Sequence, residues 1–203
     1  PAGGWRCNQA VTGPLRPPET RDCRDTIPAG AWAMALTALL AVAVYVNTVT
    51  YQFVWDDAVM VSQNWRLRDP ASVLKLLRAD FTALTSGMME GHYYRPVAAL
   101  ALAADLWLWG PTPAPFHFTN VLLHAVVTVF VGRLVVALGA GRLAAVLAAL
   151  GFALHPVHVE AVAFVSARSD LLPALIGLGS LLAYRRALGG GAGAYGWWAL
   201  AAL

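Results

Sequence analysis

The chain has 203 residues, of which 59% are hydrophobic and 12% are charged, whereas a soluble globular domain carries about a quarter charged residues. Its formal net charge is only +3, and its scattered Lys and Arg residues offer nucleic acid no continuous basic surface. The apolar residues gather in segments near the ~20 residues that cross a bilayer. We therefore expect an all-α, multi-pass membrane protein without a nucleic-acid partner.

The first fifty residues indicate a leader followed by a membrane span. Residues 1–28 are rich in Gly, Pro, Arg and Asp and have no hydrophobic period, which predicts a disordered leader. Residues 29–50 are apolar over a spanning length and follow several arginines, so this helix enters from the cytoplasm. Because the chain starts with proline and stops in an apolar run, with a further helix starting at about residue 195, we expect a fragment truncated at its C-terminus.

Residues 51–115 are polar enough to form an external loop. Within it, helical patterns at about residues 71–81 and 96–109 predict two helices at the membrane interface. The second is apolar, but its fourteen residues at ~1.5 Å each reach only ~21 Å, short of a ~30 Å hydrocarbon core. We expect it to lie along the membrane surface.

Three further spans follow, at about residues 116–138, 142–157 and 171–188. Basic residues accumulate on the cytoplasmic side of membrane proteins, and this topology places four arginines there: Arg133, Arg142, Arg185 and Arg186. If residues 96–109 also spanned, all four would lie outside. We therefore predict a membrane domain over residues 29–203 whose polar clusters share the external face.

The acidic pair Asp56 and Asp57 directly follows the first span. A carboxylate there can take the proton of an attacking hydroxyl, and neighbours in sequence do not usually point at one target. One aspartate would be the catalytic base, and the other would position it or bind a cation. The structural alternative is that the pair caps the loop at the membrane boundary.

Other ionisable residues complete the candidate site. Arg95 and Arg168 suit a phosphate because guanidinium groups bind its oxygens bidentately, although both would also serve as anchors for lipid headgroups. His155, His158 and Glu160 lie near membrane depth, where ionisable groups are usually functional, but they do not match the His-Glu-x-x-His zinc pattern, so we predict no metal site. The predicted substrate- or phosphate-binding residues are Tyr94, Arg95, His155, His158, Glu160, Arg168 and Asp170.

Several of these motifs, taken in order over roughly residues 40–188, resemble the membrane domain of the transmembrane and tetratricopeptide-repeat-containing O-mannosyltransferases and their bacterial relatives. The strings that carry the resemblance are Phe53-Val54-Trp55-Asp56-Asp57, Tyr93-Tyr94-Arg95-Pro96, Phe116-His117-Phe118-Thr119-Asn120, His155-Pro156-Val157-His158-Val159-Glu160 and Arg168-Ser169-Asp170-Leu171-Leu172.

The resemblance implies a GT-C membrane fold, in which an external-loop aspartate is catalytic and a polyprenyl-phosphate sugar, with mannose as the sugar, is the donor. Asp56 and Asp57 match that acidic pair. The implied acceptor is a hydroxyl of a protein or a glycan, on the outer side of a bacterial inner membrane or in the endoplasmic reticulum. The sequence identifies no definite cofactor, and a divalent cation stays an open alternative. The competing hypothesis is a non-catalytic membrane anchor for tetratricopeptide repeats.

Overall fold

The computed structural model describes residues 29–75 and 94–188, and in these residues it contains helices, turns and loops but no strand. The predicted leader at 1–28, the end of the predicted helix 71–81 and the apolar segment after residue 195 lie outside the described residues. The helices are α1 (Ala29–Tyr45), α2 (Pro70–Lys75), α3 (Pro96–Trp109), α4 (Pro113–Ala137), α5 (Arg142–Leu154), α6 (His158–Ala163) and α7 (Arg168–Leu188), with shorter 3₁₀ or π turns η1 (Val46–Thr50), η2 (Ala58–Ser62) and η3 (Trp65–Arg68).

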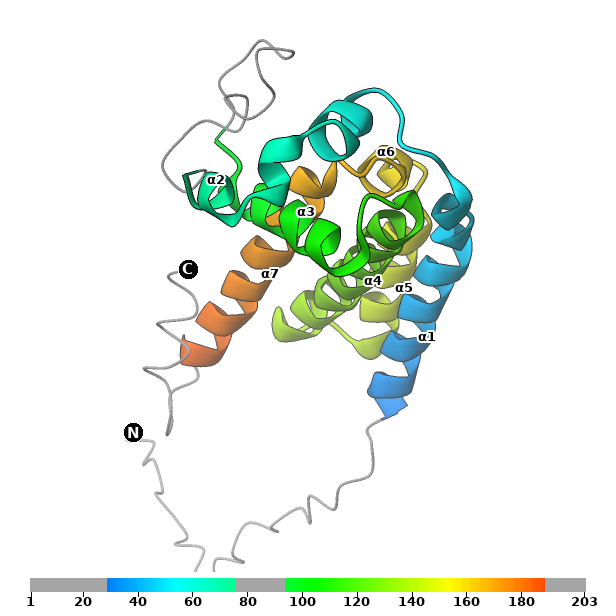
Figure 1. Cartoon of the computed structure of the whole chain (residues 1–203). Helices are drawn as coiled ribbons and strands as arrows, with labels where there is room; N and C mark the ends of the chain where they lie inside the picture. Colours follow the sequence, from blue (N-terminus) through cyan, green and yellow to red (C-terminus); the bar gives the residue numbers. More distant parts are fainter. Residues whose placement is uncertain (1–28, 76–93, 189–203) are drawn as a thin grey trace, which may run out of the picture.

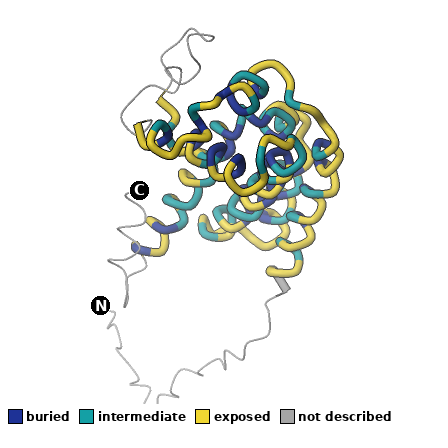
Figure 2. Tube along the Cα trace, viewed as in Figure 1, coloured by how far each residue is buried: buried dark blue, intermediate teal, exposed yellow. Residues whose placement is uncertain are grey.

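Three of these elements are long and apolar enough to cross a bilayer: α1 together with η1, then α4, then α7. Many residues of these helices are exposed (Figure 2), and the exposed residues include many large apolar ones, as expected where the solvent is lipid. The chain is therefore an all-α integral membrane protein. Helix α7 begins at Arg168, three residues earlier than the predicted start at 171, and Pro173 lies inside the helix.

Helix α5 has only 13 residues, or ~20 Å of helix, and is shorter than the predicted span 142–157. It ends at Leu154 because Pro156 favours an extended conformation at His155, whose ψ is 125°. That this segment crosses the membrane stays a prediction. The helix packs in the bundle with α1 and α4.

Small residues bring the bundle helices close together, as is common in membrane proteins. Ala41, Ala125 and Ala153 form a buried cluster that joins α1, α4 and α5. A side chain on Gly132 of α4 would collide with the sulfur of Met34, so α4 approaches α1 closely at this point. Because lipid provides no hydrophobic driving force between helices, van der Waals contact between these small residues stabilises the bundle.

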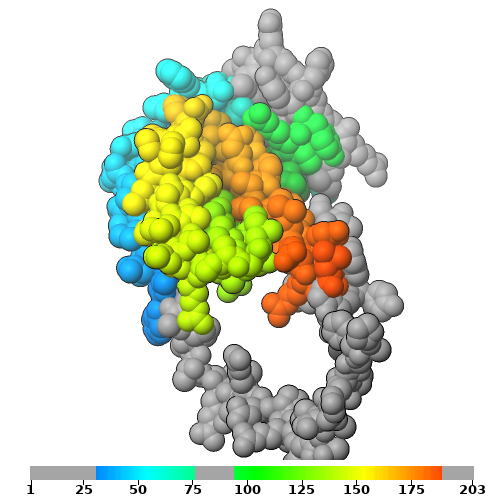
Figure 3. All heavy atoms as spheres, turned by 180° about the vertical axis from the view of Figure 1, so that it is seen from behind, coloured from blue at the N-terminus to red at the C-terminus, as the bar shows by residue number. Residues whose placement is uncertain are grey.

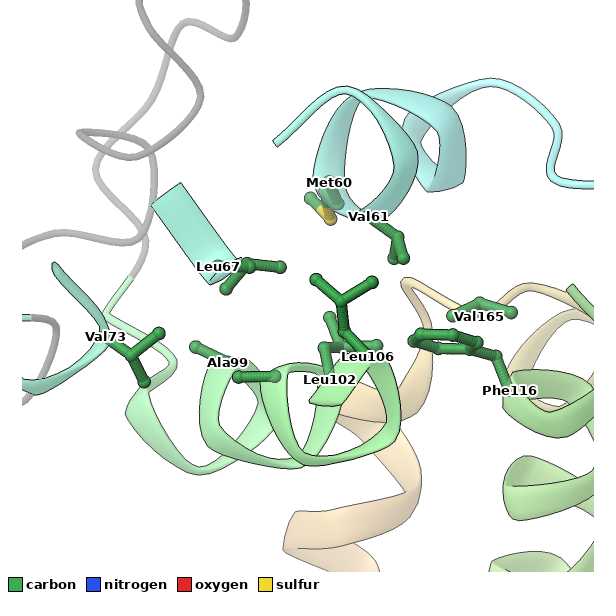
Figure 4. Packing of buried hydrophobic residues seen from close by; sticks show 10 residues of the cluster. Met60, Val61, Leu67, Val73, Ala99, Leu102, Leu106, Phe116 and Val165 are labelled. Atoms are coloured by element: carbon green, nitrogen blue, oxygen red, sulfur yellow. The ribbon is translucent and has the colours of Figure 1, made fainter. Parts of the chain in front are cut away.

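A second core lies at one end of the bundle, where α3 runs across the helix ends (Figure 1). There α3 packs against the segments that follow α1, and Figure 4 shows the side chains that meet. The cluster consists of Met60, Val61, Leu67, Val73, Ala99, Leu102, Ala103, Leu106, Phe116 and Val165. Trp107 adds a hydrogen bond from its indole N–H to the carbonyl of Leu67 at 3.0 Å. We call this layer the cap.

Candidate functional site

Polar segments that are far apart in the sequence lie close together at the cap end of the bundle. The hydroxyl of Tyr45, at the end of α1, donates to the carbonyl of His155 at 3.2 Å. The guanidinium of Arg95, just before α3, donates to the hydroxyl of Ser169 at 2.9 Å. Seen from behind, the loop after α1 (cyan), α6 (yellow) and the start of α7 (orange) adjoin on one face (Figure 3). The predicted site segments are thus close in space.

Asp57 is completely buried and connects the acidic loop to the segment before α7. Its carboxylate accepts hydrogen bonds from the backbone N–H groups of Val165, at 3.2 Å, and Ser166, at 2.7 Å. Hydrogen bonds that an anion accepts from backbone N–H groups are stronger than those between neutral groups. Asp57 is therefore committed to holding two segments together and does not line the cleft described next.

Asp56 has the opposite environment: its side chain is exposed and lines a cleft of about 840 Å³. The turn around it, with Asp57 N–H bonded to Val54 and Ala58 N–H bonded to Trp55, sends the two neighbouring carboxylates in different directions. Of the two aspartates that the sequence left open, Asp56 is the one positioned to meet a ligand.

The cleft is lined by residues from the acidic loop, from the approach to α3, and from α6 and the start of α7. They are Trp55, Asp56, Met60, Arg95, Pro156, Val157, Val159, Glu160, Phe164, Ser166, Ala167, Ser169 and Asp170. Three carboxylates, Asp56, Glu160 and Asp170, thus share the cleft with the guanidinium of Arg95. Because carboxylates repel phosphate, Glu160 and Asp170 fit hydrogen bonding to hydroxyl groups better than the phosphate contact considered from sequence.

Arg95 also borders a second hollow, an apolar groove of about 440 Å³ that runs along α7. Tyr94 lies at this groove rather than in the cleft, together with Leu172, Ile176 and Gly177. Arg95 and Ser169 line both hollows. The groove therefore continues the cleft along one of the membrane-spanning helices.

Arg168 does not reach either hollow, which corrects its predicted role as a phosphate ligand. Its guanidinium is fully buried and forms an ion pair with Asp105 at 2.7 Å. Its Nε donates to Asn120 at 2.9 Å, and its terminal nitrogens donate to the carbonyls of Ala101 and Phe116 at 3.1 and 3.0 Å. A buried charge must be paired in this way, so Arg168 joins α3, α4 and α7 beneath the cleft.

The two histidines of the His-Pro-Val-His string also lie outside the cleft. His158 packs on Phe152, with ring centroids 4.2 Å apart, and burial, together with the nearby His155, lowers its pKa from the usual 6.5. His155 is exposed and accepts the N–H of Val157 at 3.2 Å. Both are therefore corrected from ligand contact to structural packing and turn formation. Within residues 29–75 and 94–188, no group of three His, Cys, Asp or Glu side chains could hold a metal ion.

The polar face of α4 is likewise used inside the bundle. Asn120 donates to the carbonyl of Phe164 at 2.8 Å while accepting from Arg168, and His124 contacts the carbonyl of Ala153 at 3.3 Å. These two side chains therefore bond α4 to the segment before α7 and to α5. The sequence analysis did not identify Asp105 as the partner of Arg168. An acidic residue inside an apolar helix could have indicated a buried ion pair.

Comparisons with known proteins agree with the resemblance drawn from the motifs. The chain is 34% identical over 155 residues to protein O-mannosyl-transferase Tmtc1 of Drosophila melanogaster and 36% identical over 155 residues to TMTC2 of Mus musculus. It is 34% identical over 182 residues to TMTC1 of Homo sapiens. These matches cover 75%, 75% and 87% of this chain.

The same matches cover only 18%, 18% and 20% of the relatives, so the chain spans about a fifth of their length. No protein-family model and no solved structure matches the chain. The identity extends over most of this chain in every relative named above, and with its membrane-spanning helices the chain belongs to the family of the TMTC protein O-mannosyl-transferases.

Proposed function

We propose that this chain forms the donor-binding and catalytic end of a GT-C glycosyltransferase, which moves mannose from a polyprenyl phosphate to a hydroxyl acceptor, Ser or Thr of a protein. The observation that carries the proposal is the placement of Asp56 in a cleft that ends at Arg95 and continues into an apolar groove. The site thus offers a base, then a cation, then an apolar groove. The reacting molecules present the acceptor hydroxyl and sugar, then the phosphate, then the lipid chain, in the same order.

The charge distribution orients the donor. Phosphate is repelled by the carboxylates of Asp56, Glu160 and Asp170, so it belongs at the Arg95 end of the cleft. The isoprenoid chain then follows the groove past Leu172 and Ile176, and the sugar extends toward Asp56. Apolar side chains with a few polar groups at one end are typical of sites for such amphipathic ligands.

The proposed reaction is an inverting displacement. The carboxylate of Asp56 takes the proton of the acceptor hydroxyl, whose oxygen attacks C1 of the sugar. The bond between C1 and the phosphate oxygen breaks with its electron pair moving to the phosphate, and Arg95 stabilises the polyprenyl phosphate that leaves.

The outer face of the membrane is the proposed side of the reaction. Helices α1 and α5 end, and α4 and α7 begin, at the cap, whereas Arg133, Arg142 and Arg185 belong to the opposite ends of α4, α5 and α7. Arg185 there donates to the carbonyl of Ala137 at the end of α4. Arginine-bearing ends are typically cytoplasmic, and this supports an outer position for the cleft, in the endoplasmic reticulum lumen or beyond a bacterial inner membrane.

The test is Asp56→Asn in the full-length protein, assayed with dolichyl-phosphate mannose and an acceptor protein. We expect transfer to be lost because the asparagine amide cannot take the proton of the acceptor. The amount of folded protein should be unchanged because Asp56 is exposed. The matched control is Asp69→Asn in the same loop, since Asp69 caps α2 through Ser72 and asparagine caps helices well. Wild-type transfer by Asp56→Asn would refute the proposal and favour a non-catalytic membrane anchor.

A further inference from the structure

We infer that Trp55 is the platform on which the sugar ring of the donor stacks, an assignment that rests on the proposed function. Its side chain is 82% exposed, unusually high for the largest apolar residue, yet it lines the cleft directly beside Asp56. Contact with Phe164 leaves most of the indole exposed. A ligand in the cleft would cover it.

The backbone supports this assignment, because Trp55 has φ = 48°. Bulky residues rarely adopt this left-handed conformation, and where they do the strain is commonly found at functional sites. Among the described residues other than glycine, Trp55 alone has a positive φ. The turn that holds it there is fixed by the Ala58 N–H to Trp55 carbonyl bond at 3.2 Å.

A second aromatic ring lies beside the first. The ring of Phe164 is 6.0 Å from that of Trp55, with 34° between the planes, and it also lines the cleft. Both are held by the same buried carboxylate, since Asp57 follows Trp55 by two residues and bonds to Val165, the neighbour of Phe164. The pair is thus pre-positioned rather than free to move apart.

Aromatic faces beside carboxylates are complementary to a pyranose ring. The negatively charged face of an indole attracts the C–H groups on the apolar side of the sugar, and carboxylates such as Asp56 and Glu160 accept hydrogen bonds from its hydroxyl rim. An acceptor peptide would need no such combination, and a lipid headgroup would favour cationic partners over these carboxylates. The donor sugar is therefore the occupant that the cleft fits.

The experiment compares Trp55→Ala and Trp55→Phe with Trp65→Ala in the full-length protein, because Trp65 is also exposed in the external loop, at 62%, but does not line the cleft. The probes are dolichyl-phosphate mannose as donor and sugar-free dolichyl phosphate as a competitor. We expect Trp55→Ala to raise the KM for the donor about tenfold or more, as loss of a buried aromatic contact does. Trp55→Phe should retain most affinity, and the competitor should bind all variants equally.

Each other outcome overturns the inference in a recognisable way. Equal weakening of the donor and the sugar-free competitor would make Trp55 a lipid or headgroup contact. A higher KM for the acceptor alone would make it part of the acceptor site, and activity equal to that of Trp65→Ala would give it no role. These failures are distinct from failure of the proposed function, in which Asp56→Asn would keep wild-type transfer.

Discussion

The carboxylate of Asp57 accepts the backbone N–H of Ser166 at 2.7 Å, across 109 positions of the sequence. This bond and its neighbour to Val165 fix the acidic loop against the start of α7. They bury Asp57, whereas Asp56 lines the cleft. The arrangement of the cleft therefore depends on a residue that does not line it.

Asp57→Asn should destabilise the protein without a change in side-chain shape. The amide nitrogen replaces one acceptor oxygen and cannot accept from either backbone donor, so one buried N–H loses its partner. We expect a loss of about 1.5–3 kcal/mol, measured as a lower thermal midpoint of the purified full-length protein. Asp69→Asn serves as the exposed control, and equal midpoints for both variants would contradict the role assigned to Asp57.

Arg168→Met should be among the most destabilising single changes, because it leaves Asp105 charged and buried without a partner. Breaking such a pair typically costs about 3–5 kcal/mol, whereas replacing both partners by apolar residues is often nearly neutral. We therefore expect Arg168→Met with Asp105→Leu to recover much of the loss in a double-mutant cycle of thermal unfolding. Strictly additive effects would show that the ion pair contributes nothing. If the double variant folds but cannot bind donor, Arg168 has the phosphate role that its burial argues against.

Stability should fall in mild acid because of His158. Burial holds its pKa below the usual 6.5 in the folded state, so between these two values the unfolded chain binds more protons than the folded one. Stability is then fully present above about pH 6.5 and declines as the pH drops through that window. The midpoint should decrease less between pH 7.5 and pH 5 in His158→Gln than in the wild type. An identical decrease in both would assign the pH dependence to other groups.

Gly177→Trp tests the apolar groove. Nothing lies within 4 Å of the position that a Cβ would take on Gly177, so the helix tolerates the side chain while the indole fills the groove. We expect the KM for dolichyl-phosphate mannose to rise about tenfold or more, with little change in thermal midpoint. Gly151→Trp is the matched control, since Gly151 is equally open but lies on α5, outside the groove. Equal donor KM in both variants would mean that the lipid lies elsewhere.

Much of the helical framework could be predicted because it follows from local composition. Apolar runs of spanning length correspond to α1 with η1, to α4 and to α7, and the short run before Gly110 forms α3 over Pro96–Trp109. Each of these depends on residues within one helix and its immediate neighbours, which a sequence pattern contains.

Which candidate residues line the cleft and which are buried could not be predicted in the same way. Asp56 and Asp57 have the same chemistry and adjacent positions, and only contacts with Val165 and Ser166 separate them. Arg168 resembles an exposed phosphate ligand until Asp105 and Asn120 are placed around it. Such assignments depend on pairs distant in the sequence, whereas composition and spacing report only on near neighbours.

The hydrogen bond between Asp57 and Val165 can form only late in the synthesis of this part of the chain. The two residues are 108 positions apart, and at about 5–20 residues per second the ribosome needs roughly 5–20 s to make that interval. Throughout that time α1 has already been synthesised while its following loop lacks the backbone donors that will fix it. A newly made chain therefore passes through a stage in which the Asp57 carboxylate exists without the two backbone N–H donors that hold it in the folded protein.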